Sequence, residues 1–310
     1  MFRRRRTALT YCYLLLATIA LSMSRIGRAD AKTAILFGAT GAVGNDVFRA
    51  LLANNKNDAQ EPFFDKVILV GRRAFPPKVT NLFPPSGSKP EIVTVEHADL
   101  STVHQNEELL QVQQADACFN AVGAAFPHQS DLHDWHFVEV TVMESIAKLC
   151  AQLQVSSLSI FTAIDGEPDS KPYSEDELAP TGSPQGWWPV LMGTIRMMRL
   201  KERAVISSSD GIPKIRIFQP SNIVTEELRY GFLDKYLFKI HGFLDKVIPK
   251  HYHSVTTQFL GTAMVQDAVQ LLSGSSSSAT DKERVTFLDY GDFEHIVGEG
   301  IAGEENVTEL

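Results

Sequence analysis

The stretch TAILFGATGAVGNDVF, residues 33–48, decides the fold of this 310-residue chain. Its first part is an apolar run that predicts a strand over 33–38, and an amphipathic pattern predicts a helix over 45–54. Glycines between a strand and a helix let the backbone turn tightly and approach a pyrophosphate, while the helix start supplies N–H groups and a positive dipole. A purely structural tight turn is the alternative. The stretch therefore predicts a dinucleotide-binding turn, made of Gly38, Ala39, Thr40, Gly41, Ala42, Val43 and Gly44.

Apolar strand-like runs alternate with helix-like segments after this turn. Four more strands are predicted, over 66–71, 91–100, 116–123 and 157–163, and the longest helix pattern covers 133–153. Near-continuous apolar strands separated by helices indicate a parallel sheet that is covered on both faces. We therefore predict an α/β fold with a doubly wound parallel sheet, whose ligand crevice lies at the carboxyl ends of the strands.

Composition shifts along the chain predict its domain organisation. We expect a leader over 1–31 and one nucleotide-binding domain over 32–272. Within that domain, a Pro-, Gly- and acid-rich lid is expected over 164–190 and a substrate-side segment over 220–255. The polar run SGSSSSAT opens a flexible linker and tail over 273–310, in which 284–290 is a candidate edge strand.

The leader combines four arginines at positions 3–6 with an uncharged run over 7–24. This is the pattern of a signal peptide, and ADA at 29–31 offers a cleavage site; an uncleaved signal anchor and an organelle-targeting peptide are the alternatives. The pattern predicts membrane association through the N-terminal segment. The expected destinations are the endoplasmic reticulum or the mitochondrial outer membrane, with a secretory route as a further option. The sequon at Asn306 does not discriminate between them.

Charge and cysteine usage exclude several classes of function. The formal net charge is −8, which argues against a nucleic-acid partner because such a protein needs a basic face. The three cysteines, Cys12, Cys118 and Cys150, show neither a CxxC nor a Cys/His spacing. We therefore predict no metal site and no disulfide framework, and we interpret the cysteines as buried apolar thiols.

The ends of the later strands predict the rest of the nucleotide site. Arg72 and Arg73 follow the second strand, where a carboxylate would bond the ribose of NAD(H) and arginine accommodates a 2′-phosphate. NADP(H) is therefore favoured over NAD(H), the alternative being a solvated basic loop. Residues predicted to approach adenine and ribose follow the third and fourth strands: Asp99, Leu100, Ala121, Val122 and Gly123.

Together, GATGAVG, GRR, DL and NAVG at these four strand ends resemble the atypical short-chain dehydrogenase/reductases, and in particular their TIP30-like group, which includes a fungal mitochondrial outer-membrane protein. KIRIFQPSNIV over 214–224 and YHSVTTQFLGTAMVQDAVQLL over 252–272 extend the resemblance, which covers about residues 33–273. It implies a Rossmann fold, NADPH binding, a monomer or small oligomer, and an oxidoreductase-like site.

The chain departs from that family's catalytic pattern. Members that transfer hydride use a Tyr-x-x-x-Lys pair and a serine, with the tyrosine as general acid/base. No tyrosine here is followed four residues later by lysine. On the segment MMRLKERAV, Lys201 matches the family's lysine and Met197 takes the place of the tyrosine, while the hydroxyl of Thr162 lies one position before that of the serine.

Three functions are compatible with this pattern. The first is an NADP(H)-binding oxidoreductase-like protein acting on a small carbonyl substrate, with Lys201 and Thr162 as its remaining catalytic candidates. In it Tyr173, or a histidine of HYH over 251–253, would supply the proton. The alternative is a catalytically inactive NAD(P)-binding scaffold or sensor. A relative of the nucleotide-sugar epimerases is disfavoured, because they also need the tyrosine.

Overall fold

The computed structural model describes much of the chain, namely residues 31–53, 62–112, 114–124, 132–163, 187–225, 248–274 and 283–305. The chain divides into two units, residues 1–32 and 33–310, and the strands and helices of the described ranges lie in the second. Most of the predicted leader and lid, and residues 226–247 of the substrate-side segment, lie outside the described residues. Within the described ranges, no helix is both long and apolar enough to cross a membrane.

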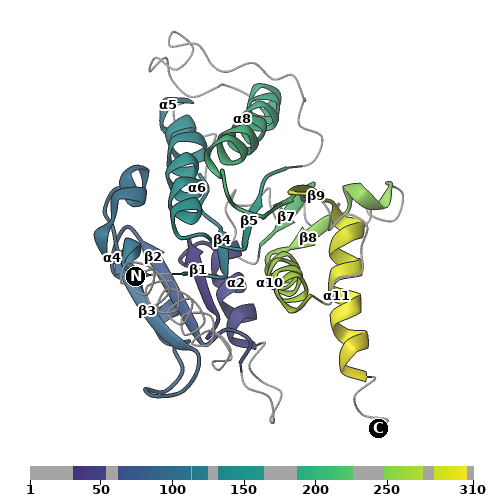
Figure 1. The fold of residues 1–310 in the computed structure, drawn as a ribbon. Helices are drawn as coiled ribbons and strands as arrows, with labels where there is room; N and C mark the ends of the chain where they lie inside the picture. Colours follow the sequence, from purple (N-terminus) through teal and green to yellow (C-terminus); the bar gives the residue numbers. More distant parts are fainter. Residues whose placement is uncertain are drawn as a thin grey trace, which may run out of the picture. The chain divides into compact units, whose positions relative to one another are not determined.

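Seven parallel strands form the central sheet, in the spatial order β3-β2-β1-β4-β5-β6-β9 (Figure 1). The strands are β1 (Thr33–Phe37), β2 (Lys66–Gly71), β3 (Glu91–Glu96), β4 (Ala117–Asn120), β5 (Ser157–Phe161), β6 (Lys214–Phe218) and β9 (Val285–Leu288). The strand order reverses between β1 and β4, where a doubly wound sheet has its ligand crevice. The predicted fold class is confirmed.

Each face of the sheet has its own apolar core, because successive strand residues point to opposite sides. Ala34 and Leu36 of β1 enter one core, whereas Ile35 and Phe37 enter the other. The helices that contribute to the first core are α2 (Ala42–Ala53), α3 (Pro77–Thr80), α10 (Thr257–Ser273) and α11 (Tyr290–Glu305). Those that contribute to the second are η1 (Leu100–Gln105), α4 (Glu107–Leu110), α6 (Val142–Gln152) and α8 (Trp187–Ser208).

The helix predicted over 133–153 is interrupted near its start. It consists of α5 (Leu132–His136), one π-helical turn, η2 (Phe137–Thr141), and then α6. A π turn places an extra residue in the helix and shifts the side chains that follow, a device that is frequent at functional sites. The remaining short elements are the 3₁₀ turn η3 (Lys250–Tyr252) and a separate parallel pair, β7 (Asn222–Val224) with β8 (Ser254–Thr256).

A buried ion pair joins the sheet to α10. Arg216 of β6 lies between Ser159 of β5 and Thr286 of β9 in the strand register, and its Nε lies 3.3 Å from Oδ2 of Asp267. Both charged residues are buried. The helix and the strand are therefore tied by opposite charges as well as by apolar packing.

The α/β domain continues past residue 272, where the sequence predicted a linker and tail with a candidate edge strand over 284–290. That edge strand is confirmed: Val285–Leu288 forms β9, which pairs in parallel with β6 and lies at the edge of the sheet. The following helix, α11, buries Phe293 and Ile296 in the same core as Leu288. The linker and tail prediction was wrong for a physical reason. A four-residue strand and a helix with few apolar side chains bury enough apolar surface to be stable only because they pack on β6 and α10. The linker itself, residues 275–282, lies outside the described residues.

Candidate functional site

The three glycines of the turn after β1 have three different steric roles. Gly38 has a φ of +83°, and a Cβ on it would lie 2.7 Å from the backbone of Ala121. A Cβ on Gly44 would lie 2.1 Å from the carbonyl oxygen of Gly38, so glycine is needed there for helix and strand to pack. Gly41 is different, because its Cβ would meet only the oxygen of Gly38, at 3.3 Å. Its outer side is open to a ligand.

Helix α2 starts directly at this turn. The amide of Gly41 donates to the oxygen of Gly38 at 2.9 Å, and that of Asn45 donates to the oxygen of Gly41 at 2.9 Å. The first turn of α2 carries no acidic side chain. The N–H groups at its start and its positive dipole therefore face the side on which Gly41 is open, which is the arrangement that holds a phosphate.

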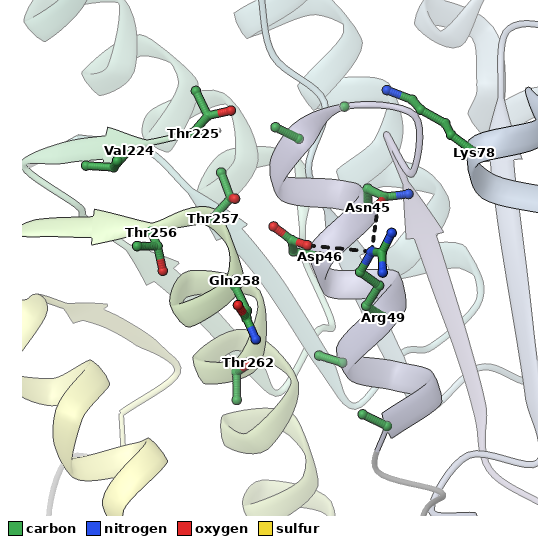
Figure 2. A pocket seen from close by; sticks show the side chains of 14 residues that line it. Asn45, Asp46, Arg49, Lys78, Val224, Thr225, Thr256, Thr257, Gln258 and Thr262 are labelled. Carbon is green, nitrogen blue, oxygen red and sulfur yellow. Dashed lines mark hydrogen bonds and ion pairs between the residues drawn. The ribbon is translucent and has the colours of Figure 1, made fainter. Parts of the chain in front are cut away.

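A cavity of about 700 Å³ lies beside Gly41 and Ala42 (Figure 2). The starts of α2 and α10 both contribute to its lining, and Lys78 of α3 and Arg49 of α2 bring positive charge. The positive charge of Arg49 is partly balanced by Asp46, whose Oδ1 lies 3.9 Å from its Nε. The same Nε donates a hydrogen bond to Oδ1 of Asn45 at 3.0 Å. The lining is mixed: alanines and Val224 lie beside polar side chains, and the carboxylate of Asp46 is present as well as the two cations.

Arg72 and Arg73 follow β2 and are exposed. Neither lines the cavity beside Gly41, and neither has an ion pair among the described residues. The structure thus leaves both guanidinium groups at the carboxyl edge of the sheet. Their contact with a 2′-phosphate stays a prediction.

Asp99 acts as the N-cap of η1. Its carboxylate accepts hydrogen bonds from the backbone amide of Ser101 at 2.9 Å and from the hydroxyl of Ser101 at 2.7 Å. The bond from the Ser101 hydroxyl is the main cause of the lowered pKa of Asp99. Leu100 is buried beneath this cap. One carboxylate oxygen of Asp99 therefore stabilises the start of η1, independently of any contact that the residue makes with a bound nucleotide.

The loop after β4 is held against the glycine turn. Ala121 lies next to Gly38, as the steric contact above requires, and the amide of Val122 donates to Oδ1 of Asn120 at 3.1 Å. The next two residues contact a carboxylate that the sequence did not indicate. A Cβ on Gly123 would lie 3.2 Å from Oε1 of Glu139.

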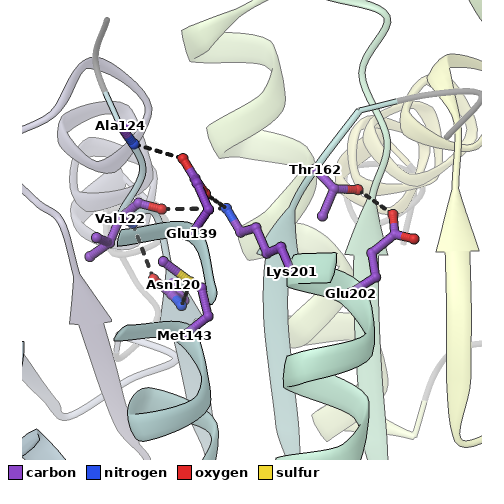
Figure 3. A network of polar contacts seen from close by, with 8 residues as sticks. All are labelled: Asn120, Val122, Ala124, Glu139, Met143, Thr162, Lys201 and Glu202. Atoms are coloured by element: carbon purple, nitrogen blue, oxygen red, sulfur yellow. Dashed lines mark hydrogen bonds and ion pairs between the residues drawn. The ribbon is translucent and has the colours of Figure 1, made fainter. Parts of the chain in front are cut away.

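Glu139 is the centre of a polar network (Figure 3). Its Oε1 accepts the amide proton of Ala124 at 2.7 Å, and its Oε2 lies 3.0 Å from Nζ of Lys201. Glu139 is 3% exposed and Lys201 is 1% exposed. The ammonium of Lys201 also lies 3.5 Å from the oxygen of Val122 and 4.9 Å from the centre of the Phe161 ring. The ammonium of Lys201 therefore lies beside the predicted cofactor loop, where it forms an ion pair with Glu139.

The hydroxyl of Thr162 is engaged in a second network. It donates to Oε1 of Glu202 at 2.7 Å, and Nε2 of Gln219 donates to the same oxygen at 2.9 Å. Arg199 pairs with the other oxygen of this buried carboxylate. Since its only proton goes to Glu202, Thr162 can accept a hydrogen bond in this arrangement but cannot donate one to a substrate carbonyl.

The position of the family's tyrosine is apolar. Met197 is 0% exposed and packs with Trp135 and Met198, against which Ala124 and Ala163 also lie. Met197 and Lys201 lie one helical turn apart on α8, so they share a face as the family's pair would. A thioether has no proton to transfer, so of these two side chains only Lys201 carries one.

The predicted alternative proton donors have other contacts. His253 has its Nε2 3.3 Å from the oxygen of Ile248, and its ring lies 5.3 Å from that of Tyr290. His251 stacks on Tyr252, with ring centres 4.1 Å apart. Tyr173 lies outside the described residues. Across the described ranges, no group of three or more His, Cys, Asp or Glu residues could hold a metal ion.

Two carboxylates and an amide of these networks were not found from the sequence. Glu139 and Glu202 each lie in a helical segment that reads as ordinary amphipathic helix, and Gln219 occupies the place of an arginine in the resembled family. The sequence feature that could have indicated a buried carboxylate is a charged residue inside an apolar run, as in FVEVTV over 137–142. Their partners are distant in sequence, so no local pattern could pair them.

Comparison with known proteins establishes the fold. No protein-family model matches the chain, and no curated protein matches its sequence. Among solved structures, it is similar to a 3-oxoacyl-acyl-carrier-protein reductase from Brucella melitensis in complex with NAD, with 11% identity, 86% of this chain and 98% of that chain covered, and a TM-score of 0.54.

Two further structures are similar in the same way. The terminal R domain of the myxalamid PKS-NRPS biosynthetic pathway has 16% identity over 84% of this chain and 66% of that chain, with a TM-score of 0.52. A UDP-glucuronic acid 4-epimerase from Bacillus cereus in complex with NAD has 13% identity over 83% of this chain and 77% of that chain, with a TM-score of 0.50. At these identities the likeness is one of fold: this chain has the Rossmann-type fold in which those two NAD complexes are built.

Proposed function

We propose that this protein binds NADP(H) at the turn after β1 and is an oxidoreductase-like member of the atypical short-chain dehydrogenases/reductases, close to the TIP30-like group. One observation carries the proposal: Gly38 and Gly44 are sterically obligatory, whereas Gly41 is open on the side of the α2 N-terminus. That division of roles is what a pyrophosphate-binding turn needs. The nicotinamide group would supply hydride chemistry when bound, and the residues named here would bind and orient it.

The preference for NADP(H) rests on charge. The segment after β2 has Arg72 and Arg73 and no carboxylate to bond a free ribose 2′-hydroxyl. Lys78, in the cavity beside Gly41, adds a cation on the same side. Under this proposal the adenosine side of the site is lined by Ala121, Val122 and Gly123. It is closed by Asp99 and Leu100.

A second function, an NADP(H)-binding protein without reductase activity, is favoured by the two networks. Lys201 is paired with Glu139, Thr162 donates to Glu202, and Met197 replaces the tyrosine. Among the three described residues at the family's catalytic positions, none would therefore donate a hydroxyl proton to a small carbonyl substrate. In this version nucleotide occupancy changes the surface that the protein presents to a partner. The leader, residues 1–31, would fix the protein to the endoplasmic reticulum or mitochondrial outer membrane.

The binding proposal is tested by titrating NADPH and NADH into the full-length protein in mild detergent, with nicotinamide fluorescence as the readout. NADPH is expected to bind at least tenfold more tightly than NADH. Replacing both arginines, Arg72→Ala with Arg73→Ala, should remove that preference. The control Lys89→Ala should not, because this exposed lysine lies before the amino end of β3 and pairs with Asp65. No binding of either nucleotide would end both versions of the proposal.

Catalysis is tested separately on protein that binds NADPH. A panel of small aldehydes and ketones is screened for NADPH oxidation at 340 nm. The inactive version predicts no turnover above the rate without protein. Ready turnover by the unmodified chain would contradict it and would require a proton donor other than a tyrosine on α8.

A further inference from the structure

Two cysteine side chains meet inside the second apolar core. Cys118 lies on β4 and Cys150 near the end of α6, and their Sγ atoms are 2.6 Å apart. Both are fully buried and belong to the core beneath α6 and α8. From the sequence, both were interpreted as buried apolar thiols outside any disulfide framework, so their direct contact is unexpected. Both thiols are free in this structure, and the contact is a hydrogen bond from the Cys150 thiol to the sulfur of Cys118. Cysteines whose side chains meet in this way need little backbone movement to be bridged.

We propose that Cys118 and Cys150 form an intramolecular disulfide in the protein folded under oxidising conditions. In this bond β4 is joined to α6, the helix that continues from the π turn carrying Glu139. Cys118 also precedes Asn120 and the loop that lies against Gly38. The disulfide therefore fastens together the two segments that hold the predicted cofactor loop.

The bond forms by thiol–disulfide exchange with a low-molecular-weight disulfide such as oxidised glutathione. The two cysteine S–H bonds and the S–S bond of the reagent break; one protein S–S bond and two reagent S–H bonds form. The cysteines lose two electrons and two protons, and the reagent gains them.

Burial decides when this exchange occurs. Desolvation, and next the contact with Cys150, raises the pKa of the Cys118 thiol, so the reactive thiolate is scarce in the folded protein. Neither sulfur is accessible to a reagent after folding. The disulfide therefore forms while the chain folds, and in the native protein it resists reduction. It is a structural bond and not a rapid switch.

The test counts thiols in full-length protein refolded with a glutathione redox buffer, blocked with iodoacetamide and then denatured. Compared with a fully reduced sample, the oxidised sample should lose two titratable thiols and have a mass lower by about 2 Da, and a peptide containing both cysteines should appear in a non-reducing digest. Equal thiol counts in the two samples would overturn the proposal.

Stability gives an independent readout that does not depend on a variant folding well. Reduction under denaturing conditions followed by refolding should lower the Tm of the native protein by on the order of 10 °C. In Cys150→Ala the same treatment should leave the Tm unchanged, whereas Cys12→Ala, a change in the leader, should respond like the native chain. A reduction-independent Tm in the native chain would contradict a stabilising bond even if some disulfide formed.

Discussion

Replacing Gly41 by alanine separates nucleotide binding from folding. A Cβ at this position meets only the carbonyl oxygen of Gly38, at 3.3 Å, so a shift of a few tenths of an ångström accommodates it. The residue is exposed and its backbone is not in the left-handed region. We therefore expect Gly41→Ala to change the free energy of unfolding by no more than about 1 kcal/mol.

Binding should respond far more strongly. Under the proposal, the added methyl group takes up space at the start of α2 that the phosphate needs, and it prevents the close backbone approach that glycine permits. We expect the Kd for NADPH to rise at least tenfold, which corresponds to about 1.4 kcal/mol or more. Urea denaturation gives the unfolding free energy, and nicotinamide fluorescence gives the Kd, on the same preparation.

Two other glycines serve as controls. Gly44→Ala would place a Cβ 2.1 Å from the oxygen of Gly38, which only a backbone displacement relieves, so it should cost about 3 kcal/mol or more in stability. Gly298→Ala, on the exposed side of α11 with no atom within 4 Å, should affect neither readout adversely. A folded Gly41→Ala variant with unchanged NADPH affinity would refute the assignment of the turn as the phosphate site.

Three further predictions concern the charged and apolar groups around the sheet. Asp267→Asn removes the carboxylate charge that lies 3.3 Å from Nε of Arg216 in the core. Urea denaturation should show that the free energy of unfolding falls by about 3–5 kcal/mol. A decrease below about 1 kcal/mol would contradict a structural role for the ion pair. Met197→Tyr adds volume and a hydroxyl to a fully buried site, so the free energy of unfolding should fall by about 1–3 kcal/mol. NADPH-dependent carbonyl reduction should appear in this variant only if the new hydroxyl reaches Lys201. Desolvation lowers the pKa of His136, so the folded state binds its proton less readily than the unfolded state; stability should fall as the pH drops below 6.5, and His136→Gln should flatten the Tm–pH curve there.

Most strands and helices of the fold were predictable from short local sequence patterns. The strands β1 and β2 and the helix that follows the glycine turn could be predicted, because each depends on an apolar run or a 3.6-residue period within one short segment. The π turn η2 was not predicted, since the apolar positions of 133–153 fit one continuous helix equally well. The last strand was predicted only as a candidate, over 284–290, because VTFL over 285–288 is short and follows a polar run.

The site was predictable only where one segment defines it. The glycine turn needs nothing beyond its own sequence, and Met197 with Lys201 is a local spacing. The pairing of Lys201 with Glu139, and of Cys118 with Cys150, depends on which helix packs against which strand. Such contacts are set by the tertiary structure, so a single sequence cannot specify them.

The central claim is that the turn after β1 binds NADP(H) beside a face of α8 that lacks a proton-donating tyrosine. A crystal structure of the full-length protein with NADP⁺ tests it most directly. The account predicts the pyrophosphate over Gly41 at the start of α2, the 2′-phosphate near Arg72 and Arg73, and the side chain of Met197 where the family has its tyrosine. A pyrophosphate bound elsewhere, or a tyrosine hydroxyl within hydrogen-bond distance of a substrate at nicotinamide C4, would contradict it.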